Sequence, residues 1–498
     1  MYVNKLTMNG VRGFDGKRKV ALDFARPDGS YAGWTVLAGR NGSGKTTLLR
    51  AIAIGLIGQR LSMQLEDTLE GWLSENRKQG SIALEISNDP LWDAGYSEET
   101  LGTVAMSWRF GSGRSRKVMD EALFEYRLKE RNEFRHFIAP ELQEHLLLDR
   151  VSVSFKADAL LGEVLWSGSR IPGWFIAAYG PFRRLTGGDS DFERSPVNSK
   201  NPRSSRIPDY ADKMFAVRTL FSERDSLSEA VAWLVRLHLQ RLEEQQENVN
   251  SRGSAELLEA IFELLQDGLL PDHYKVDRVD SQGLWIIHDE TGRSTPLRQM
   301  SDGYRTVVAL VLDIIRRMFA AYPYPDVHRV VYQDGRPTLR HPGVVLIDEV
   351  DAHLHVSWQQ RIGAWLKLHF PQVQFIVTTH SPYICQAADE NGLIRLPGPS
   401  EASPPSVVDQ DLYRRVVYGT GDDAVISDLF GLDTPYSMEA QDLRKRLLRL
   451  ERLLISGHAS DEDVESLREI KVQLSSSPVT RVDEISVRLL GDSNGGGI

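Results

Sequence analysis

Hydrophobic residues recur with strand-like and helix-like spacing in two separate parts of the chain. Trp34 to Gly39 is a short apolar run that predicts a buried strand, and Thr46 to Ile57 is an Ala- and Leu-rich run that predicts a helix. Strands that alternate with helices indicate a parallel sheet, so the predicted fold class is α/β. The same alternation returns after residue 297, with a helix over Gly303 to Phe319, a strand over Gly343 to Asp351, a helix over Ser357 to His369 and a strand over Val373 to Ser381.

The middle of the chain, about residues 60–295, is patterned less regularly. Leu185 to Asp209 is rich in Ser, Pro, Asn and Gly, which predicts a loop or a disordered segment. The apolar runs predict strands over Ser81 to Ser87, Gly102 to Phe110 and Gly173 to Gly180, and a hairpin over Tyr274 to Gly292. Helical spacing predicts helices over Asp120 to Phe134, Leu227 to Glu247 and Ala255 to Gln266.

The C-terminal part begins with a stretch rich in Pro and Ser, Leu396 to Ser406, which predicts a linker. Two charged helices are predicted after it, over Glu439 to Ile455 and Asp461 to Leu474. These helices are interpreted as a surface for docking a partner, and a solvated hairpin remains an open alternative.

Composition limits the class of protein. The 498-residue chain is 41% hydrophobic and 26% charged, which is typical of a soluble globular protein. No apolar run approaches the roughly 18 residues that a membrane span needs, and the first residues lack the apolar core of a signal peptide. Cys385 is the only cysteine, which excludes an intramolecular disulfide and is typical of a reducing compartment. We therefore expect a cytoplasmic protein without a membrane partner.

Net charge is −10, because 59 Lys and Arg face 69 Asp and Glu. Such an acidic chain is not expected to bind nucleic acid over its whole surface. Two local stretches are basic, Trp108 to Lys117 and Arg170 to Arg184. Solvated surface is the favoured interpretation of both, and contact with DNA remains open.

Gly39 to Thr46 fits the phosphate-loop pattern G-x-x-x-x-G-K-[ST], between a predicted strand and a predicted helix. Glycines let the backbone curl so that N–H groups face phosphate oxygens, and the helix N-terminus adds its positive end. Lys45 is expected to reach the β- and γ-phosphates, and the Thr46 hydroxyl is expected to ligate Mg²⁺. The predicted nucleotide-binding residues of this loop are Gly39, Arg40, Asn41, Gly42, Ser43, Gly44, Lys45, Thr46 and Thr47.

Acidic residues and a histidine follow two of the later apolar strands. "VVLIDEVD" delivers Asp348 and Glu349 at the end of a strand, which suits a Walker B site. Asp348 is predicted to hold Mg²⁺, and Glu349 is predicted to orient and deprotonate the attacking water. His380 ends the next strand, "FIVTTHS", where it is predicted to sense the γ-phosphate through a hydrogen bond.

"MSDGYRT" places Ser301 and Gly303 just before a predicted helix. A helix start is an anion-binding surface, but the chain's own phosphate loop already has one. We therefore expect this segment to close over the nucleotide of a second copy in a head-to-tail dimer.

These four motifs together resemble those of ABC-type ATPase heads, and "LIDEVDAHLHVSWQQ" and "VTTHSPYI" are similar to the RecF, SMC-like and OLD group. The resemblance implies a P-loop NTPase fold with a mixed, mainly parallel sheet, a large α+β insertion and a C-terminal helical tail. It implies ATP and Mg²⁺ as cofactors, Ser301 and Gly303 as signature residues, and Asp351 as a dimer-contacting D-loop residue. Tyr179 to Arg183 is hypothesised as the Q-loop. Asn9 to Phe14 resembles the segment in which an arginine and an aromatic residue approach the base.

The resemblance implies four regions along the chain. Residues 1–60 form the first half of the head, 61–295 an insertion, 296–395 the second half, and 396–498 a linker and docking tail. "AAYGPFRRL" and "DDAVISDLFGLDTPYS" are further similar to the ATPases of Septu antiphage systems and their retron-linked relatives. That similarity implies an HNH nuclease of the PtuB type as partner.

Two related architectures are disfavoured by the pattern. The roughly 300 residues between the phosphate loop and Asp348 lack the sustained heptads of SMC-like coiled coils. The roughly one hundred residues after His380 lack the acidic strand pattern of an OLD-type nuclease domain. The leading hypothesis is a homodimeric ATPase switch, or a higher assembly of dimers, that regulates a nuclease in antiphage defence. A RecF-like ATPase that clamps DNA is the main alternative, and a self-sufficient nuclease or a transporter subunit is less favoured.

Overall fold

The computed structural model describes residues 1–65, 69–74, 77, 79–89, 91–93, 101–110, 119–128, 173–183, 216–222, 227–246, 253–270, 273–322, 330–432 and 434–474. Contacts between Cα atoms divide the chain into two compact units, Met1–Gly431 and Leu432–Ile498. The predicted loop over Leu185 to Asp209 lies outside the described residues, as do residues 111–117 of the first basic stretch and residues 170–172 and 184 of the second.

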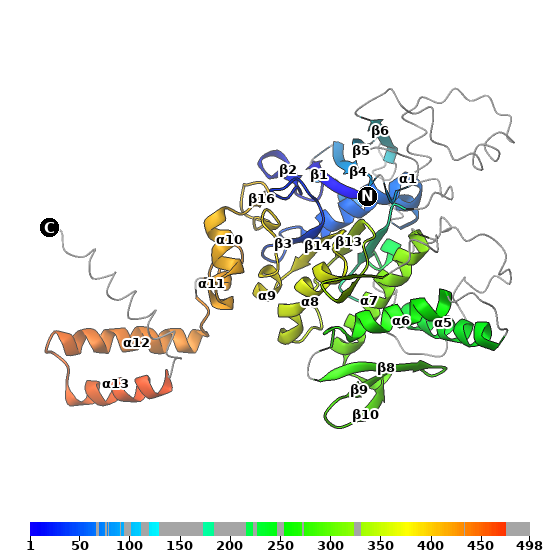
Figure 1. The fold of residues 1–498 in the computed structure, drawn as a ribbon. Helices are drawn as coiled ribbons and strands as arrows, with labels where there is room; N and C mark the ends of the chain where they lie inside the picture. Colours follow the sequence, from blue (N-terminus) through cyan, green and yellow to red (C-terminus); the bar gives the residue numbers. More distant parts are fainter. Residues whose placement is uncertain are drawn as a thin grey trace. The chain divides into compact units, whose positions relative to one another are not determined.

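A six-stranded, mainly parallel sheet forms the centre of the first unit (Figure 1). Its strands are parallel to their neighbours except at one edge, where β16 is antiparallel to β15. This confirms the predicted parallel sheet and the α/β fold class. In the order of the sheet, the strands are β16 (Ser406–Val407), β15 (Leu393–Arg395), β3 (Gly33–Ala38), β14 (Val373–Thr379), β13 (Gly343–Ile347) and β7 (Ile176–Tyr179).

Side chains on the two faces of the central sheet pack into different hydrophobic cores. Trp34, Val36 and Ala38 of β3 lie in one core, and Leu37 between them lies in the other. This alternation follows from the two-residue period of a strand. The first core is shared with α5 (Ser228–Gln246), α6 (Gly253–Gln266), α7 (Asp302–Ala321) and α8 (Val356–His369). The second is shared with α1 (Lys45–Leu65) and an antiparallel sheet.

The antiparallel sheet has five strands and joins the N-terminus to part of the predicted insertion (Figure 1). The predicted helix over Asp120 to Phe134 is wrong for residues 120–128, which belong to a strand, and residues 129–134 lie outside the described residues. Its residues Ala122, Phe124, Tyr126 and Leu128 repeat every second position, so the strand period outweighs the helix-forming Glu and Leu residues. In order, the strands are β2 (Val20–Asp23), β1 (Tyr2–Asn9), β4 (Gln79–Ser87), β5 (Leu101–Phe110) and β6 (Met119–Leu128).

Other predicted elements are confirmed with small changes of boundary. The hairpin over Tyr274 to Gly292 consists of two strands, and a third strand extends it into a small sheet. The helix predicted over Gly303 to Phe319 is α7. The remaining elements of the first unit are β8 (Tyr274–Asp280), β9 (Gly283–His288), β10 (Arg293–Pro296), β11 (Val331–Gln333), β12 (Arg336–Thr338), α9 (Pro382–Cys385), α10 (Gln410–Val417) and α11 (Gly421–Val425).

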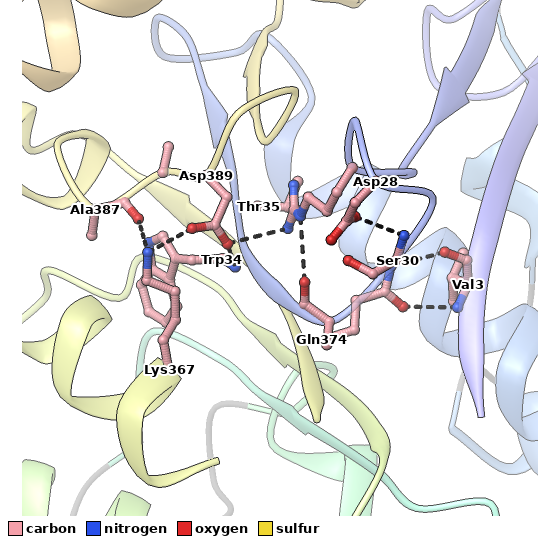
Figure 2. A network of polar contacts seen from close by, with 12 residues as sticks. Val3, Asp28, Ser30, Trp34, Thr35, Lys367, Gln374, Ala387 and Asp389 are labelled. Carbon is pink, nitrogen blue, oxygen red and sulfur yellow. Dashed lines mark hydrogen bonds and ion pairs between the residues drawn. The ribbon is translucent and has the colours of Figure 1, made fainter. Parts of the chain in front are cut away.

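A polar network, buried at Gln374 and half-buried at Asp389, fixes the starting ends of β3 and β14, opposite the ends that carry the motifs (Figure 2). The Gln374 side chain makes two 2.8 Å hydrogen bonds with the backbone of Val3, which join β14 to β1. Asp389 accepts a 2.6 Å hydrogen bond from the backbone N–H of Trp34 and pairs with Lys367 at 2.6 Å. Because buried polar groups are costly unless paired, these contacts specify how the two sheets and β3 meet.

The second unit contains a helical hairpin of α12 (Met438–Ile455) and α13 (Asp461–Gln473), as predicted. Ser460 and Asp463 form a capping box at the start of α13. The buried core of the hairpin consists of Leu447, Leu450, Leu467 and Ile470. Among the helices that the structure describes, none is both long and apolar enough to cross a membrane.

Candidate functional site

The predicted phosphate loop connects the end of β3 to the start of α1. Gly42 and Gly44 have φ angles of 75° and 96°, which side-chain-bearing residues rarely adopt. A side chain at Gly44 would also collide with the ring of Phe14. Phe14 is only 1% exposed and packs against the loop backbone at Gly44, where it supports the curvature of the loop. The approach of the segment Asn9 to Phe14 to the base stays a prediction.

Lys45 begins α1 and is buried within the loop. Its ammonium group donates hydrogen bonds to the carbonyl oxygens of Gly39 at 2.8 Å and Arg40 at 3.2 Å. Burial lowers the pKa of Lys45, while the negative charges of Asp348 and then Glu349 act in the opposite direction. The carboxylates therefore favour the charged form of Lys45, and its buried ammonium is the group of the loop that can pair with a dense anion.

Asp348 follows β13 and lies beside the phosphate loop. The Thr46 hydroxyl donates a 2.7 Å hydrogen bond to its Oδ2 atom, and the Thr378 hydroxyl donates a 2.5 Å hydrogen bond to its Oδ1 atom. Asp348 is only 1% exposed. The structure therefore brings together the two predicted metal ligands and adds a residue, Thr378, that sequence reasoning did not assign.

Glu349 occupies a strained turn after Asp348. Its φ angle is 46°, in the left-handed region, and its backbone N–H donates a 2.7 Å hydrogen bond to Thr378 Oγ1. Left-handed geometry in a residue other than glycine is uncommon and clusters at functional sites. Behind the turn, the guanidinium of Arg183 donates hydrogen bonds to the carbonyl oxygens of residues 348–350. Arg183 is 1% exposed, so this member of the second basic stretch is not solvated surface.

Asp351 and His380 are joined at the end of β14. Oδ1 of Asp351 accepts hydrogen bonds from the Thr379 hydroxyl at 2.5 Å and from the backbone N–H of His380 at 3.3 Å. The pKa of His380 is lowered first by burial and then by the positive charge of Lys45. His380 therefore lies within the electrostatic reach of the phosphate-loop lysine.

Ser301 and Gly303 lie at the start of α7. Ser301 is exposed and its side chain makes no capping hydrogen bond to the helix. Gly303 is buried, and a Cβ atom there would lie 2.9 Å from the carbonyl oxygen of His353 and 3.0 Å from the ring of Trp358. Only glycine at position 303 allows α7 to start so close to the turn that follows Glu349. The Ser301 side chain, two residues earlier, lies at the surface.

Two turns from the C-terminal part cover the phosphate loop, residues 396–401 and 427–431, which we call the strap. The Arg40 side chain donates to the carbonyl oxygen of Phe430 at 3.3 Å and to that of Gly431. A Cβ atom at Gly42 would lie 3.1 Å from the side chain of Pro399. The prediction of a linker over Leu396 to Ser406 is therefore wrong for its first residues, because they pack on the phosphate loop.

The strap is held together by one arginine. Arg395 donates a 3.0 Å hydrogen bond to the carbonyl oxygen of Asp428 and forms a 2.6 Å ion pair with Glu401. A hydrogen bond from the backbone of Gly398 is the main cause that lowers the pKa of Glu401, followed by the bond from Arg395. The two turns thus form one structure.

The donor set suits Mg²⁺. Mg²⁺ prefers hard oxygen ligands and usually takes one or two from the protein, with the rest from water and phosphate. Thr46 Oγ1 and Asp348 Oδ2 are such a pair and lie at hydrogen-bonding distance from each other. Within the part of the chain that the structure describes, no group of three or more His, Cys, Asp or Glu residues forms a protein-only metal site.

Two family models match the chain. One described as "AAA domain, putative AbiEii toxin, Type IV TA system" matches residues 180–386, and another described as "AAA domain" matches residues 5–141. The first range contains Asp348, Glu349 and His380, and the second contains the phosphate loop.

Relatives of known name match parts of the chain. The Retron Ec83 probable ATPase of Escherichia coli is 42% identical over 108 residues, 22% of this chain and 18% of the relative. The Septu protein PtuA of Bacillus mycoides (strain KBAB4) is 25% identical over 374 residues, 75% of this chain and 37% of the relative. The chain therefore spans less than two fifths of the length of these relatives.

Among solved structures, the Smc head bound to the C-winged helix domain of ScpA matches 82% of this chain and 98% of that chain. The sequence identity is 18% and the TM-score is 0.42. The fold class is therefore assigned from the central sheet with its phosphate loop and from the family matches, and not from this structural similarity. The chain has an α/β fold of the P-loop NTPase type and matches AAA-domain models over parts of its length, and it is similar to the Septu protein PtuA and to retron ATPases, as its motifs predicted.

Proposed function

We propose that the chain binds and hydrolyses ATP with Mg²⁺ and acts as a nucleotide-dependent switch in antiphage defence. The observation that carries the proposal is the hydrogen bond between Thr46 and Asp348, which joins the phosphate loop to the acid 302 residues later. The names of the relatives, which are Septu and retron proteins, support the setting in defence.

Each residue of the site has a role in this proposal. Thr46 and Asp348 would hold Mg²⁺, which supplies charge neutralisation on the phosphate oxygens when bound. The Lys45 ammonium would exchange its loop carbonyls for the β- and γ-phosphates. Glu349 would orient a water molecule and accept its proton, and neutral His380 would donate a hydrogen bond toward the γ-phosphate.

The site would be completed by a second copy of the chain. Ser301, exposed and without a capping hydrogen bond, supports a role for the start of α7 as a lid over the partner's nucleotide. Asp351 would lie at the dimer contact. ATP binding would bring two heads together and hydrolysis would separate them, which gives a two-state element.

A separate protein would perform the destructive step. By resemblance to Septu systems, we infer an HNH-type nuclease as the partner. The hairpin of α12 and α13 supports a docking role, because several large apolar side chains on it are exposed, including Leu448, Leu454, Ile455 and Val472.

The proposal is tested by ATP binding and hydrolysis in purified protein. Glu349→Gln is expected to bind ATP but to hydrolyse it about 10²-fold or more slowly, and to shift toward a dimer with ATP. Lys45→Ala is expected to lose nucleotide affinity, whereas Lys367→Ala, a lysine of the polar network in Figure 2, keeps it. Wild-type hydrolysis by Glu349→Gln would refute the catalytic assignment, and unchanged binding by Lys45→Ala would refute the loop's role.

ATP hydrolysis by the same purified protein distinguishes the proposal from its main alternative, a DNA-clamping ATPase. If DNA stimulates ATP hydrolysis with a steep dependence on salt, a DNA-clamping ATPase fits better than a defence switch. Under the proposal, ATP turnover responds to the nuclease partner and not to DNA alone.

A further inference from the structure

The guanidinium of Arg183 is buried against the backbone of the turn that carries Glu349. Nη1 donates to the carbonyl oxygens of Gly180 at 2.9 Å and Asp348 at 2.8 Å. Nη2 donates to those of Glu349 at 2.9 Å and Val350 at 3.0 Å. The three consecutive carbonyls of residues 348–350 therefore converge on one side chain.

Such a set of contacts needs arginine. Its planar guanidinium presents donors in a fixed fork, whereas a lysine ammonium is a compact point charge that cannot span the same acceptors. Burial lowers the pKa of Arg183 to about 10, and the carboxylates of Asp348, Asp351 and Glu349 partly offset that effect. The Arg183 guanidinium remains charged at neutral pH, and it lies directly behind the turn that carries these three carboxylates.

The turn at Glu349 has a strained backbone that must be held by its surroundings. Left-handed geometry in a residue other than glycine persists only where neighbouring contacts fix it. Glu349 is fixed on both of its peptide groups, because its N–H donates to Thr378 and its carbonyl accepts from Arg183. Thr378 belongs to β14, and Arg183 follows β7 on the other side of β13.

We propose that Arg183 is a positioning residue for ATP hydrolysis, which holds the Glu349 turn in the geometry needed to activate water. The inference rests on the proposed ATPase function and adds a residue that acts through Glu349 without touching the nucleotide. It predicts a defect in turnover, because a shift of about 1 Å in a reacting group can cost about a hundredfold in rate.

The test compares Arg183→Lys with a matched control, Arg26→Lys. Arg26 is also buried, at 7% exposure, but donates to Thr35 at the opposite end of β3. For Arg183→Lys we expect kcat to fall at least about tenfold, with KM for ATP and the affinity for a non-hydrolysable analogue within about twofold. For Arg26→Lys we expect kcat per folded molecule to stay near wild type. Thermal unfolding of both variants separates loss of fold from loss of turnover.

A double variant separates positioning from general stability. If Arg183 acts through Glu349, Arg183→Lys adds no further loss of turnover in the Glu349→Gln background. Additive losses, or a wild-type kcat in Arg183→Lys, would overturn the inference while leaving the ATPase proposal intact. Absence of ATP hydrolysis by the wild type would overturn both, so the two failures are distinguishable.

Discussion

Thr378 holds Asp348 and Glu349 at the same time, because its hydroxyl donates to Asp348 Oδ1 at 2.5 Å and accepts from the Glu349 N–H at 2.7 Å. Thr378→Val keeps the shape of the side chain and removes both hydrogen bonds. We expect a loss of about 1–3 kcal/mol in the free energy of unfolding, because the buried Asp348 carboxylate and the half-buried Glu349 N–H each lose a hydrogen bond. Urea denaturation measures that loss, and turnover should fall more than ATP affinity.

The control for this substitution is Thr338→Val. Thr338 is equally buried and donates a 2.6 Å hydrogen bond to the carbonyl oxygen of Val331, away from the motifs. It should lose stability without a specific loss of turnover. Equal effects of the two variants on kcat would show that Thr378 has no particular link to the acids.

Asp348→Asn should weaken the effect of Mg²⁺ on nucleotide binding. The amide keeps the size of the side chain but removes the negative charge that, with Thr46, would hold the metal. We expect the Mg²⁺ concentration needed for half-maximal ATP hydrolysis to rise at least about tenfold. Titration of Mg²⁺ at fixed ATP measures this, and an unchanged half-maximum would exclude Asp348 as a ligand.

Because the pKa of His380 is lowered in the folded protein, the free energy of unfolding depends on pH. The ordinary histidine pKa is 6.5, and burial followed by the charge of Lys45 lowers it in the folded protein. The unfolded chain then binds the proton more readily, so stability is full above about pH 6.5 and falls as the pH drops through the folded pKa. Urea unfolding at several pH values should show a shallower acid slope in His380→Gln than in wild type. An equal acid slope in His380→Gln and in wild type would contradict this expectation.

Gly431 tests the connection between the strap and the phosphate loop. Its φ angle is 62°, and a Cβ atom there would collide with the guanidinium of Arg40. Gly431→Ala should therefore displace Arg40 and lower ATP affinity, which fluorescent-nucleotide binding measures. Gly457→Ala is the matched control, because its φ angle is 72° and nothing lies within 4 Å of the added carbon. Both variants carry backbone strain of about 1 kcal/mol, but only the first contacts the loop.

The hairpin of α12 and α13 should lose its fold independently of the first unit. Its core is small, and Leu447→Ala removes one of four buried side chains. The loss of about 2–5 kcal/mol expected for such a change exceeds what a two-helix hairpin can tolerate. Limited proteolysis should then cut within 438–474 while ATP hydrolysis stays at the wild-type level. A parallel loss of ATPase activity would mean that the two units do not fold separately.

The phosphate loop and the acidic motif after β13 are predictable from sequence because the chemistry that they suit constrains residue types at short spacing. The loop from Gly39 to Thr46 needs glycines, a lysine and a hydroxyl in fixed order, and Asp348 and Glu349 follow an apolar strand. The strands and helices around these motifs have long, strongly periodic patterns. Those features therefore match between the sequence and the structure.

The supporting contacts are less predictable because they use backbone groups. Arg183 and Arg40 bind carbonyl oxygens, which every residue has, so no pattern of side chains marks the segments that they contact. The first turn of the strap, residues 396–401, belongs to the Pro- and Ser-rich stretch typical of a linker, although it packs on the phosphate loop. The sequence predicts a helix where β6 forms, because ten residues are too few to separate the helical period from the strand period.

The last residue of the first unit, Gly431, accepts a hydrogen bond from an arginine of the phosphate loop. The connection to the second unit consequently starts next to Arg40. Under the proposed function, a protein bound to α12 and α13 would be joined to the phosphate loop through the backbone of the same chain. Its local concentration near the loop would then depend on the length of that connection and not only on its affinity.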